Sequence, residues 1–349
     1  MSLTDRARLT IDLDALAHNR AVLAAEAAGA EVAAVVKSDG YGLGAGAIAK
    51  RLYAEGTRSF FVARIAEGEA LRADLGDRDA AVYVLDGLLD GTADRLASAG
   101  LTPVIATAAQ AEAARSFGRP IALQVDTGMN RQGLTLDKAR AVASGLEVSL
   151  VMSHLGSATD PAEPRNPEQL ARFREVRGLF PHARASLAAS AGAFLGPDYR
   201  YDMVRAGISL FGGGPGERPD PRLKAVATLT APILDIRRLA TGDRVGYGSS
   251  FTAPGPMRVA VVAAGYSDGM IRAAMGRGCA WAAGARRVLL AVNMDILVIA
   301  LPDGGAVGDP VELLGPNALL DDLANAAGTV AHEVLVRLSS RAERVYLGA

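Results

Sequence analysis

Short apolar runs alternate with Ala-rich, charge-bearing segments from about residue 30 to residue 215. The runs that read as strands are Val32–Lys37, Phe60–Arg64, Ala81–Asp86, Pro103–Thr107, Ile121–Asp126, Val148–His154, Ala185–Ser190 and Asp202–Arg205. The stretches between them have helical spacing, as in Ala66–Leu75, Asp94–Ala99 and Ala108–Ser116. Alternating strands and helices are typical of parallel βα units, and this number of units predicts a closed (β/α)8 TIM-type barrel.

The pattern changes after the Gly/Pro cluster Gly212–Pro215, which predicts a linker. Strand-like runs with turn residues between them follow: Ala225–Ile236, Val245–Phe251, Met257–Tyr266, Arg286–Met294, Asp295–Leu301, Pro310–Leu314 and Glu333–Leu338. Helical spacing is clear only around Leu319–Ala327. We therefore expect a barrel over residues 1–220 and a mostly antiparallel β domain over residues 221–349. A strand-like segment within residues 1–12 is able to pair with the β domain.

Composition narrows the class of protein further. The 349 residues are 50% hydrophobic and 21% charged, with a net charge of -1, which is typical of a globular protein and argues against nucleic-acid or membrane partners. No apolar run is long enough to span a bilayer. The first residues lack the layout of a signal peptide, and a single cysteine, Cys279, fits a reducing compartment. We expect a cytoplasmic protein.

The residues that follow the predicted barrel strands carry chemistry, since working residues of βα barrels lie at the carboxyl ends of strands. These candidates are Lys37, Arg131, His154, Ser190, Arg205, Gly207 and Ile208. A lysine that ends an apolar strand is a candidate Schiff-base amine, because partial burial lowers its pKa. On position alone, a solvated lysine is the commoner alternative.

Ser190 and the Gly207–Ile208 amides follow the last two barrel strands, where this fold often binds phosphate through backbone N–H groups. Taken by itself, Gly207 is better explained as a turn residue. The Gly-rich stretch Asp39–Gly46 matches neither the dinucleotide fingerprint nor a P-loop. An amine, a phosphate corner and a fixed arginine together indicate a phosphorylated aldehyde cofactor. We expect no metal.

Seven segments in chain order resemble motifs of the alanine racemase family. Ala34–Gly44, AVVKSDGYGLG, resembles the family's pyridoxal-phosphate (PLP) lysine signature. The other segments are Asp126–Gly133 (DTGMNRQG), Ser153–Asp160, Asp202–Leu210 (DMVRAGISL), Val245–Gly248 (VGYG), Gly265–Gly269 (GYSDG) and Asn293–Asp295 (NMD). The resemblance covers roughly residues 34–341 and implies a PLP-dependent enzyme with a barrel followed by a β domain.

The resemblance also implies a two-base interconversion of L- and D-alanine. Lys37 carries the cofactor and acts on the D side, and Tyr247 of the partner subunit acts on the L side. Racemisation requires a base on each face of the substrate carbon, with a pKa near the working pH. A free tyrosine has a pKa of about 10, so nearby cations must lower it, and His154 and Arg205 are the candidates.

Further roles follow from the same resemblance. Arg205 faces the pyridine nitrogen, where an arginine, which keeps its proton, disfavours transamination. The phosphate is held by Tyr41, Ser190, Gly207 and Ile208. Arg131 and the Met294 backbone N–H bind the substrate carboxylate. Tyr247 and Met294 come from the second subunit, so the expected assembly is a homodimer with shared sites. Tyr266 and Asp160 are candidates for the path by which substrate approaches.

Three positions depart from the family pattern. Gln124 stands where many members have a carbamylated lysine, so Arg131 must be oriented by Gln124, by a bound anion such as chloride or by another carboxylate. Asn293 replaces a cysteine before Met294. Ser340 replaces a tyrosine that touches the phosphate and narrows the approach to the site, which leaves the substrate breadth open.

Three alternatives remain at this stage. A broader racemase of serine or other small amino acids is kept open by Ser340. A decarboxylase of similar architecture normally has a glutamate at the pyridine nitrogen, which Arg205 opposes. In a third alternative, a PLP-binding protein without catalysis, Tyr247 and Met294 would have no purpose.

Overall fold

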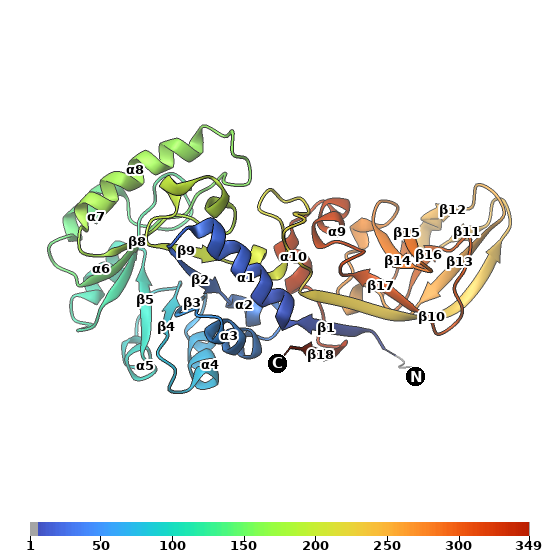
Figure 1. The fold of residues 1–349 in the computed structure, drawn as a ribbon, viewed down its shortest axis with the longest axis horizontal. Coiled ribbons are helices and arrows are strands. Elements are labelled where there is room, and N and C mark those ends of the chain that lie inside the picture. Colours follow the sequence, from blue (N-terminus) through green and yellow to red (C-terminus); the bar gives the residue numbers. More distant parts are fainter. Residues whose placement is uncertain (1–5, 349) are drawn as a thin grey trace. The chain divides into compact units, whose positions relative to one another are not determined.

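The computed structural model describes residues 6–348. It contains two compact units. The barrel unit runs from Ala17 to Leu210. The β unit combines the N-terminal segment through Leu16 with the chain from Phe211 onward. Figure 1 labels the elements of both units.

Eight parallel strands form the barrel, as predicted. They are β2 (Glu31–Val35), β3 (Ser59–Val62), β4 (Ala81–Val84), β5 (Leu101–Ile105), β6 (Ile121–Gln124), β7 (Val148–Met152), β8 (Arg184–Ser186) and β9 (Met203–Ala206). Strands β2 to β8 pair in chain order, and β9 pairs back onto β2 with Ala33 opposite Arg205. A bridge from Ala189 to Arg205 links the end of β8 to β9. The sheet therefore closes.

Helices follow most of the barrel strands (Figure 1). They are α2 (Lys37–Tyr41), α3 (Ala45–Ala54), α4 (Ile65–Leu75), α5 (Ala93–Ser98), α6 (Ala108–Ala114), α7 (Leu136–Val142) and α8 (Arg165–Leu179), and α1 (Leu13–Ala27) precedes β2. The 3-10 turns η1 (Ala191–Phe194), η2 (Pro197–Tyr199) and η3 (Ile208–Phe211) complete the unit. Side chains from every barrel strand except β8 form one buried core cluster, in which the Phe61 and Tyr83 rings stack with centroids 4.6 Å apart. This core holds in place the ends of the strands near which the candidate residues lie.

The β unit is a mostly antiparallel sheet, again as predicted. Its strands are β1 (Arg8–Asp12), β10 (Ala227–Leu239), β13 (Met257–Val262), β14 (Cys279–Ala282), β15 (Ala285–Val292), β16 (Leu297–Ala300), β17 (Pro310–Leu314) and β18 (Glu343–Leu347). The order is β13-β16-β15-β14-β17-β10-β1-β18, and β10 also pairs with β13. The N-terminal β1 pairs with β10 and, in parallel, with β18.

Two predicted strands of the β unit are wrong. Glu333–Leu338 lies largely in helix α10 (Ala331–Val336), which follows α9 (Leu320–Ala327). Its buried residues Val334, Leu335 and Leu338 are spaced as on one helix face. Val245–Phe251 is a hairpin of the short strands β11 (Arg244–Val245) and β12 (Phe251–Thr252) around the turn η4 (Tyr247–Ser249).

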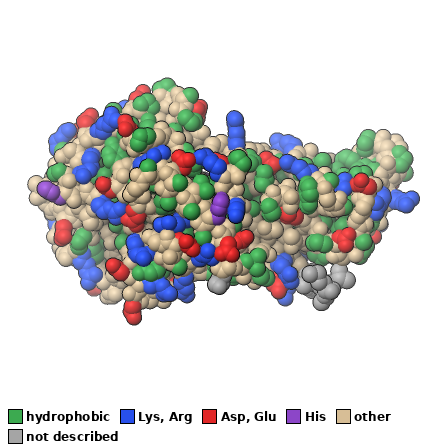
Figure 2. All heavy atoms as spheres, in the orientation of Figure 1, with side chains coloured by type: hydrophobic (Ala, Val, Ile, Leu, Met, Phe, Trp, Pro, Cys, Tyr) green, Lys and Arg blue, Asp and Glu red, His purple; other side chains and the backbone are tan. Residues whose placement is uncertain are grey.

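On the face shown in Figure 2, basic and acidic side chains are interspersed, in line with the net charge of -1. Within residues 6–348, no helix has the length and apolar character needed to cross a membrane.

Candidate functional site

Lys37 lies directly after β2, at the start of a turn with unusual backbone geometry. Ser38, Asp39, Gly40 and Tyr41 all have positive φ values, of 54°, 54°, 62° and 58°. L-residues disfavour this left-handed conformation, and runs of it concentrate at functional sites. The turn is held by hydrogen bonds, including one from the Ala45 N–H to the Asp39 carboxylate at 2.9 Å. The backbone around the candidate amine is therefore fixed in one conformation.

The Lys37 side chain is half-buried, and its environment favours the neutral amine. Burial lowers the pKa of Lys37, the cation of Arg131 lowers it further, and the anion of Glu67 opposes the shift. A lowered pKa increases the fraction of the nucleophilic form near neutral pH. The structure thus gives Lys37 the electrostatic setting that a covalently acting amine needs.

Arg205 is buried at the end of β9 and is held by acceptors from two neighbouring strands. Its Nη1 donates to the Ser186 carbonyl at 2.9 Å and to the Ser186 hydroxyl at 2.6 Å. Its Nη2 donates to the Ser153 carbonyl at 2.5 Å and lies 3.3 Å from Nδ1 of His154. Burial, with a smaller effect from Arg131, lowers the pKa of Arg205 to about 10. Among residues 6–348, no acceptor binds its Nε–H.

Tyr41, Gly207 and Ser190 meet where β2 and β9 lie side by side. A Cβ on Gly207 would lie 2.4 Å from the Tyr41 hydroxyl, so this close approach requires glycine. The Ser190 hydroxyl accepts hydrogen bonds from the N–H groups of Gly207, at 2.9 Å, and Ser209, at 3.3 Å. Ile208, between them, starts η3.

This corner fits an anionic ligand. Both acceptor positions of the Ser190 hydroxyl are used, which leaves its O–H as a donor. The Ser209 hydroxyl is buried and has no hydrogen-bond partner within the described part of the chain. Buried hydroxyls rarely lack a hydrogen-bond partner, so a buried hydroxyl without one indicates that a ligand or a water molecule binds there. A phosphate bound here would accept from the Ser190 hydroxyl, consistent with the cofactor predicted from the sequence.

Arg131 is exposed at the end of a loop that follows β6. The Asp126 carboxylate oxygen Oδ1 accepts from the N–H groups of Gly128, Met129 and Asn130, at 2.8, 2.9 and 3.2 Å. A carboxylate with three backbone donors is a strong local anchor. This anchor orients the loop, and Arg131 acts electrostatically on both Lys37 and Arg205.

Helix α8 ties the Arg131 loop to the His154 segment. Nε2 of Gln169 donates to the His154 carbonyl at 2.9 Å and to the Thr127 hydroxyl at 3.3 Å. The Thr127 and Ser153 hydroxyls are 2.8 Å apart. The two strand-end loops that carry Arg131 and His154 are therefore connected through one buried glutamine.

The structure thus brings the barrel candidates together by a chain of contacts and charge interactions. Lys37, Arg131, Arg205 and His154 form one part of this set. Tyr41, Gly207 and Ser190 form the other. Asp160, also in the barrel unit, is exposed, and its carboxylate accepts from the Ala162 N–H at 3.0 Å.

Tyr247, Met294 and Tyr266 lie in the β unit. Their side chains are 83%, 53% and 45% exposed, which is unusual for large apolar groups. The Tyr266 N–H donates to the Asn293 carbonyl at 2.9 Å, so the Tyr266 turn packs beside the Met294 segment. Gly265 allows this approach, because a Cβ there would lie 2.2 Å from the Asn293 carbonyl oxygen.

The structure also shows where Gln124 and Ser340 lie, two residues that depart from the family pattern. Gln124 ends β6 with its side chain buried. Ser340 is exposed, next to Arg341, whose guanidinium pairs with Asp295 at 2.5 Å and with Asp268 at 3.5 Å. Arg341 therefore links the segment that carries Ser340 to the Met294 and Tyr266 segments.

Several residues of the site were missed by sequence reasoning. Ser186 and Gln169 support Arg205 and the loops through contacts between distant positions, and nothing local in the sequence signals these contacts. Asp126 had a usable signal, since an aspartate two residues before a glycine is typical of an Asx turn. Glu67 contacts the N–H of Ser38 at 2.7 Å, yet reads as an ordinary acidic residue in the first turn of a helix.

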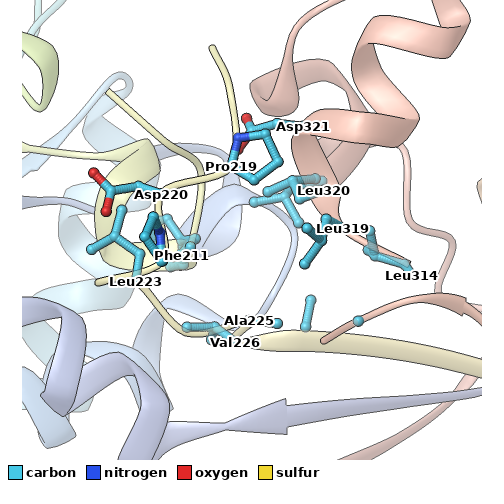
Figure 3. Close-up of a pocket in the computed structure, with 15 residues that line it drawn as sticks. Phe211, Pro219, Asp220, Leu223, Ala225, Val226, Leu314, Leu319, Leu320 and Asp321 are labelled. Atoms are coloured by element: carbon cyan, nitrogen blue, oxygen red, sulfur yellow. The ribbon is translucent and has the colours of Figure 1, made fainter. Parts of the chain in front are cut away.

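A cavity of about 330 Å³ lies within the β unit (Figure 3). Leucine side chains of the linker and of the α9 region face it, among them Leu223, Leu319 and Leu320. Asp321 contributes a buried carboxylate that accepts from the Gly214 N–H at 2.9 Å. None of its lining residues is a candidate residue. Within residues 6–348, no cluster of His, Cys, Asp or Glu could hold a metal ion.

Comparison with known proteins identifies close relatives. The family model described as alanine racemase, N-terminal domain, matches residues 11–215, and the model for the alanine racemase C-terminal domain matches residues 226–346. An alanine racemase of Methylobacterium nodulans is 43% identical, covering 98% of this chain and 96% of that protein. A catabolic alanine racemase of Agrobacterium fabrum is 40% identical, covering 97% and 92%.

Solved structures agree with the sequence relatives. The alanine racemase from Bartonella henselae with covalently bound pyridoxal phosphate aligns with a TM-score of 0.91 and 33% identity, covering 98% of this chain and 99% of that chain. The resemblance predicted from the motifs is confirmed by both kinds of comparison.

Proposed function

The chain belongs to the alanine racemase family, and from that premise we propose that it interconverts L-alanine and D-alanine with PLP bound to Lys37. PLP would supply an aldehyde for the substrate amine and a ring that stabilises charge at the substrate's α-carbon. The observation that carries the proposal is Arg205, whose Nη groups are both engaged while its Nε–H has no acceptor in the described chain. Such an arginine donates to a ring nitrogen without protonating it. That arrangement favours reversible proton exchange over transamination.

Two bases carry the proton exchange in this proposal. Burial and the Arg131 cation lower the pKa of Lys37, which favours the neutral amine, the form that accepts a proton. Tyr247 supplies the opposite base from the partner subunit. In this role the Tyr247 phenol needs a nearby cation, and the buried guanidinium of Arg205 is the candidate.

The remaining candidate residues bind the phosphate of the cofactor and the carboxylate of the substrate. Ser190, with Tyr41, Gly207 and Ile208, holds the phosphate in the corner where the Ser190 hydroxyl and the Tyr41 hydroxyl lie beside Gly207. Arg131, on the loop anchored by Asp126, binds the substrate carboxylate together with the Met294 N–H. The substrate class is a small amino acid.

We extend the proposal to a cytoplasmic homodimer with shared sites. The exposure of Tyr247, Tyr266 and Met294 supports a surface that a second copy covers. The free Cys279 suits a reducing compartment.

The exposed serine at position 340 supports a second candidate function. Ser340 offers little bulk where the family has tyrosine, and it is exposed. A wider approach to the site would favour a racemase that also accepts serine. Binding contacts that differ by a methyl group or two give only about 1–3 kcal/mol of discrimination.

The proposal is tested by reconstituting the purified chain with PLP and measuring D-alanine formed from L-alanine by chiral chromatography. We expect turnover in the wild type and none in Lys37→Ala. Wild-type protein that carries PLP at Lys37 and forms no D-amino acid would support a cofactor-binding protein instead.

A further inference from the structure

Glu67 joins the Lys37 turn to the neighbouring strand end through its carboxylate. Its Oε1 accepts from the Ser38 N–H at 2.7 Å. Its Oε2 accepts from the N–H groups of Ala63, at 2.8 Å, and Arg64, at 3.0 Å. Ser38 follows β2 and Ala63 follows β3, so one carboxylate clamps two adjacent strand ends.

The backbone at this point needs support. The left-handed run starts at Ser38, the residue after Lys37, and three of its four members are not glycine. Such backbone persists only where surrounding contacts over-determine it. The Glu67 bond to the Ser38 N–H is made at the first strained residue. It therefore fixes the direction in which the Lys37 side chain leaves the sheet.

Glu67 also acts on Lys37 through its charge. Arg131, in the loop after β6, and Glu67, at the start of α4, are the charged groups that influence the Lys37 amine, with opposite effects. The anion of Glu67 offsets part of the effect of the Arg131 cation. Glu67 therefore both holds the Lys37 turn and affects the pKa of the Lys37 amine.

We propose that Glu67 is the positioning residue of the Lys37 turn, holding the amine in the orientation from which it is linked to the cofactor. This inference rests on the proposed function, because the linked cofactor is PLP. Glu67 does not touch substrate or cofactor; it acts through the Ser38 and Ala63–Arg64 backbone.

A carboxylate is required because three N–H donors converge on its two oxygens. A glutamine of the same shape has one acceptor oxygen, and its NH2 group would face an N–H group. Either Ser38 or the Ala63–Arg64 pair would lose its acceptor. An aspartate keeps the charge but is one methylene shorter, so it does not span both strand ends.

The matched control is Glu69, two residues along the same helix. Its carboxylate pairs with Arg95 at 2.6 Å and 2.9 Å. Glu69→Gln makes the same change of side chain and removes the same charge from α4 without touching the Lys37 turn. Any effect of net charge alone appears equally in both variants.

The experiment compares wild type, Glu67→Gln, Glu67→Asp and Glu69→Gln by two readouts that do not require turnover. The first is the dissociation constant of PLP, followed by the absorbance of the Lys37-linked cofactor. The second is the pH dependence of Lys37 labelling by an amine-reactive reagent in the apo protein, read by mass spectrometry.

For Glu67→Gln we expect a PLP dissociation constant raised about tenfold, the effect of losing a hydrogen bond to a charged group, and a labelling midpoint shifted to lower pH. The shift is downward because the anion that favours the protonated amine is gone. Glu67→Asp should weaken PLP binding similarly with a smaller shift of the midpoint. Glu69→Gln should match wild type in both readouts.

Equal PLP binding and equal midpoints in Glu67→Gln and Glu69→Gln would overturn the inference. If Glu67→Gln does not fold, Glu67→Asp decides the positioning role by its PLP affinity. Failure of the proposed function is seen separately, as wild-type protein in which PLP does not attach to Lys37.

Discussion

Nη2 of Arg205 lies 3.3 Å from Nδ1 of His154. Because an arginine only donates, Nδ1 is the acceptor in this contact, and the imidazole carries its proton on Nε2. Arg205 thus sets the tautomer of His154. The same guanidinium joins the ends of β7, β8 and β9, through Ser153 and Ser186.

Replacing Arg205 with Gln should destabilise the fold and alter the chemistry. The carbonyls of Ser186 and Ser153 would lose a charged donor while buried, which costs about 1–3 kcal/mol for each unsatisfied group. We expect a fall of about 2–4 kcal/mol in the free energy of unfolding by urea. The variant should also form more pyridoxamine phosphate per turnover than wild type. An unchanged partition between racemisation and transamination would contradict the role given to Arg205.

Arg131→Gln should raise the pKa of Lys37. The Arg131 cation disfavours the protonated amine, so removing it lets Lys37 hold its proton to higher pH. The labelling midpoint of Lys37 in the apo protein should move to higher pH, opposite in sign to Glu67→Gln. Arg131→Lys, which keeps the charge, serves as the control and should stay near wild type. A midpoint that moves downward in Arg131→Gln would be incompatible with this electrostatic account.

Gly207→Ala should weaken PLP binding through Tyr41. The added methyl group would lie 2.4 Å from the Tyr41 hydroxyl and 3.7 Å from Cβ of Val35, so the hydroxyl has to move. We expect the PLP dissociation constant to rise at least about tenfold, corresponding to about 1.4 kcal/mol. In a Tyr41→Phe background, the added effect of Gly207→Ala should be smaller, because the atom in conflict is absent. Additive effects in the double variant would show that the two residues do not meet at the phosphate corner.

Tyr247→Phe should remove turnover but keep the cofactor. The side chain is 83% exposed, so the fold loses no packing when its hydroxyl is removed. A missing general base reduces turnover by about 10²–10⁴. PLP binding should be unchanged, which separates a catalytic loss from a structural one. Full activity in this variant would exclude Tyr247 as the second base.

Ser340→Tyr should narrow the substrate range. A larger side chain at this exposed position is expected to hinder serine more than alanine, by up to about 1–3 kcal/mol. The ratio of kcat/KM for alanine over serine should therefore rise relative to wild type. If the ratio is the same in both proteins, position 340 does not control substrate breadth.

The barrel was predictable because each of its strands is a short apolar run with a helical stretch beside it. Glu333–Leu338 was misassigned because its apolar residues both alternate and recur at helical spacing, and a run this short does not decide between them. Strands β14 and β18 went unpredicted. Trp281, in β14, pairs with Glu312 of β17, and such a distant partner leaves no local signal.

The candidate residues at the strand ends were predictable from topology, since β2 and β9 had to be neighbours once the barrel closed. The residues that hold these candidates in place were not predictable from the sequence. Glu67 and Gln169 act by bridging loops that are 29 and 42 residues apart from them in the chain. Such contacts depend on how helices α4 and α8 pack in the folded protein, so the local sequence pattern does not predict them.

The central claim is tested most directly by proton NMR in heavy water, following the α-proton of L-alanine in the presence of PLP-loaded protein. The account predicts loss of the α-proton signal together with the appearance of D-alanine, and neither in the Lys37→Ala variant. Absence of exchange with alanine, serine and larger amino acids, while Lys37 carries PLP, would contradict it.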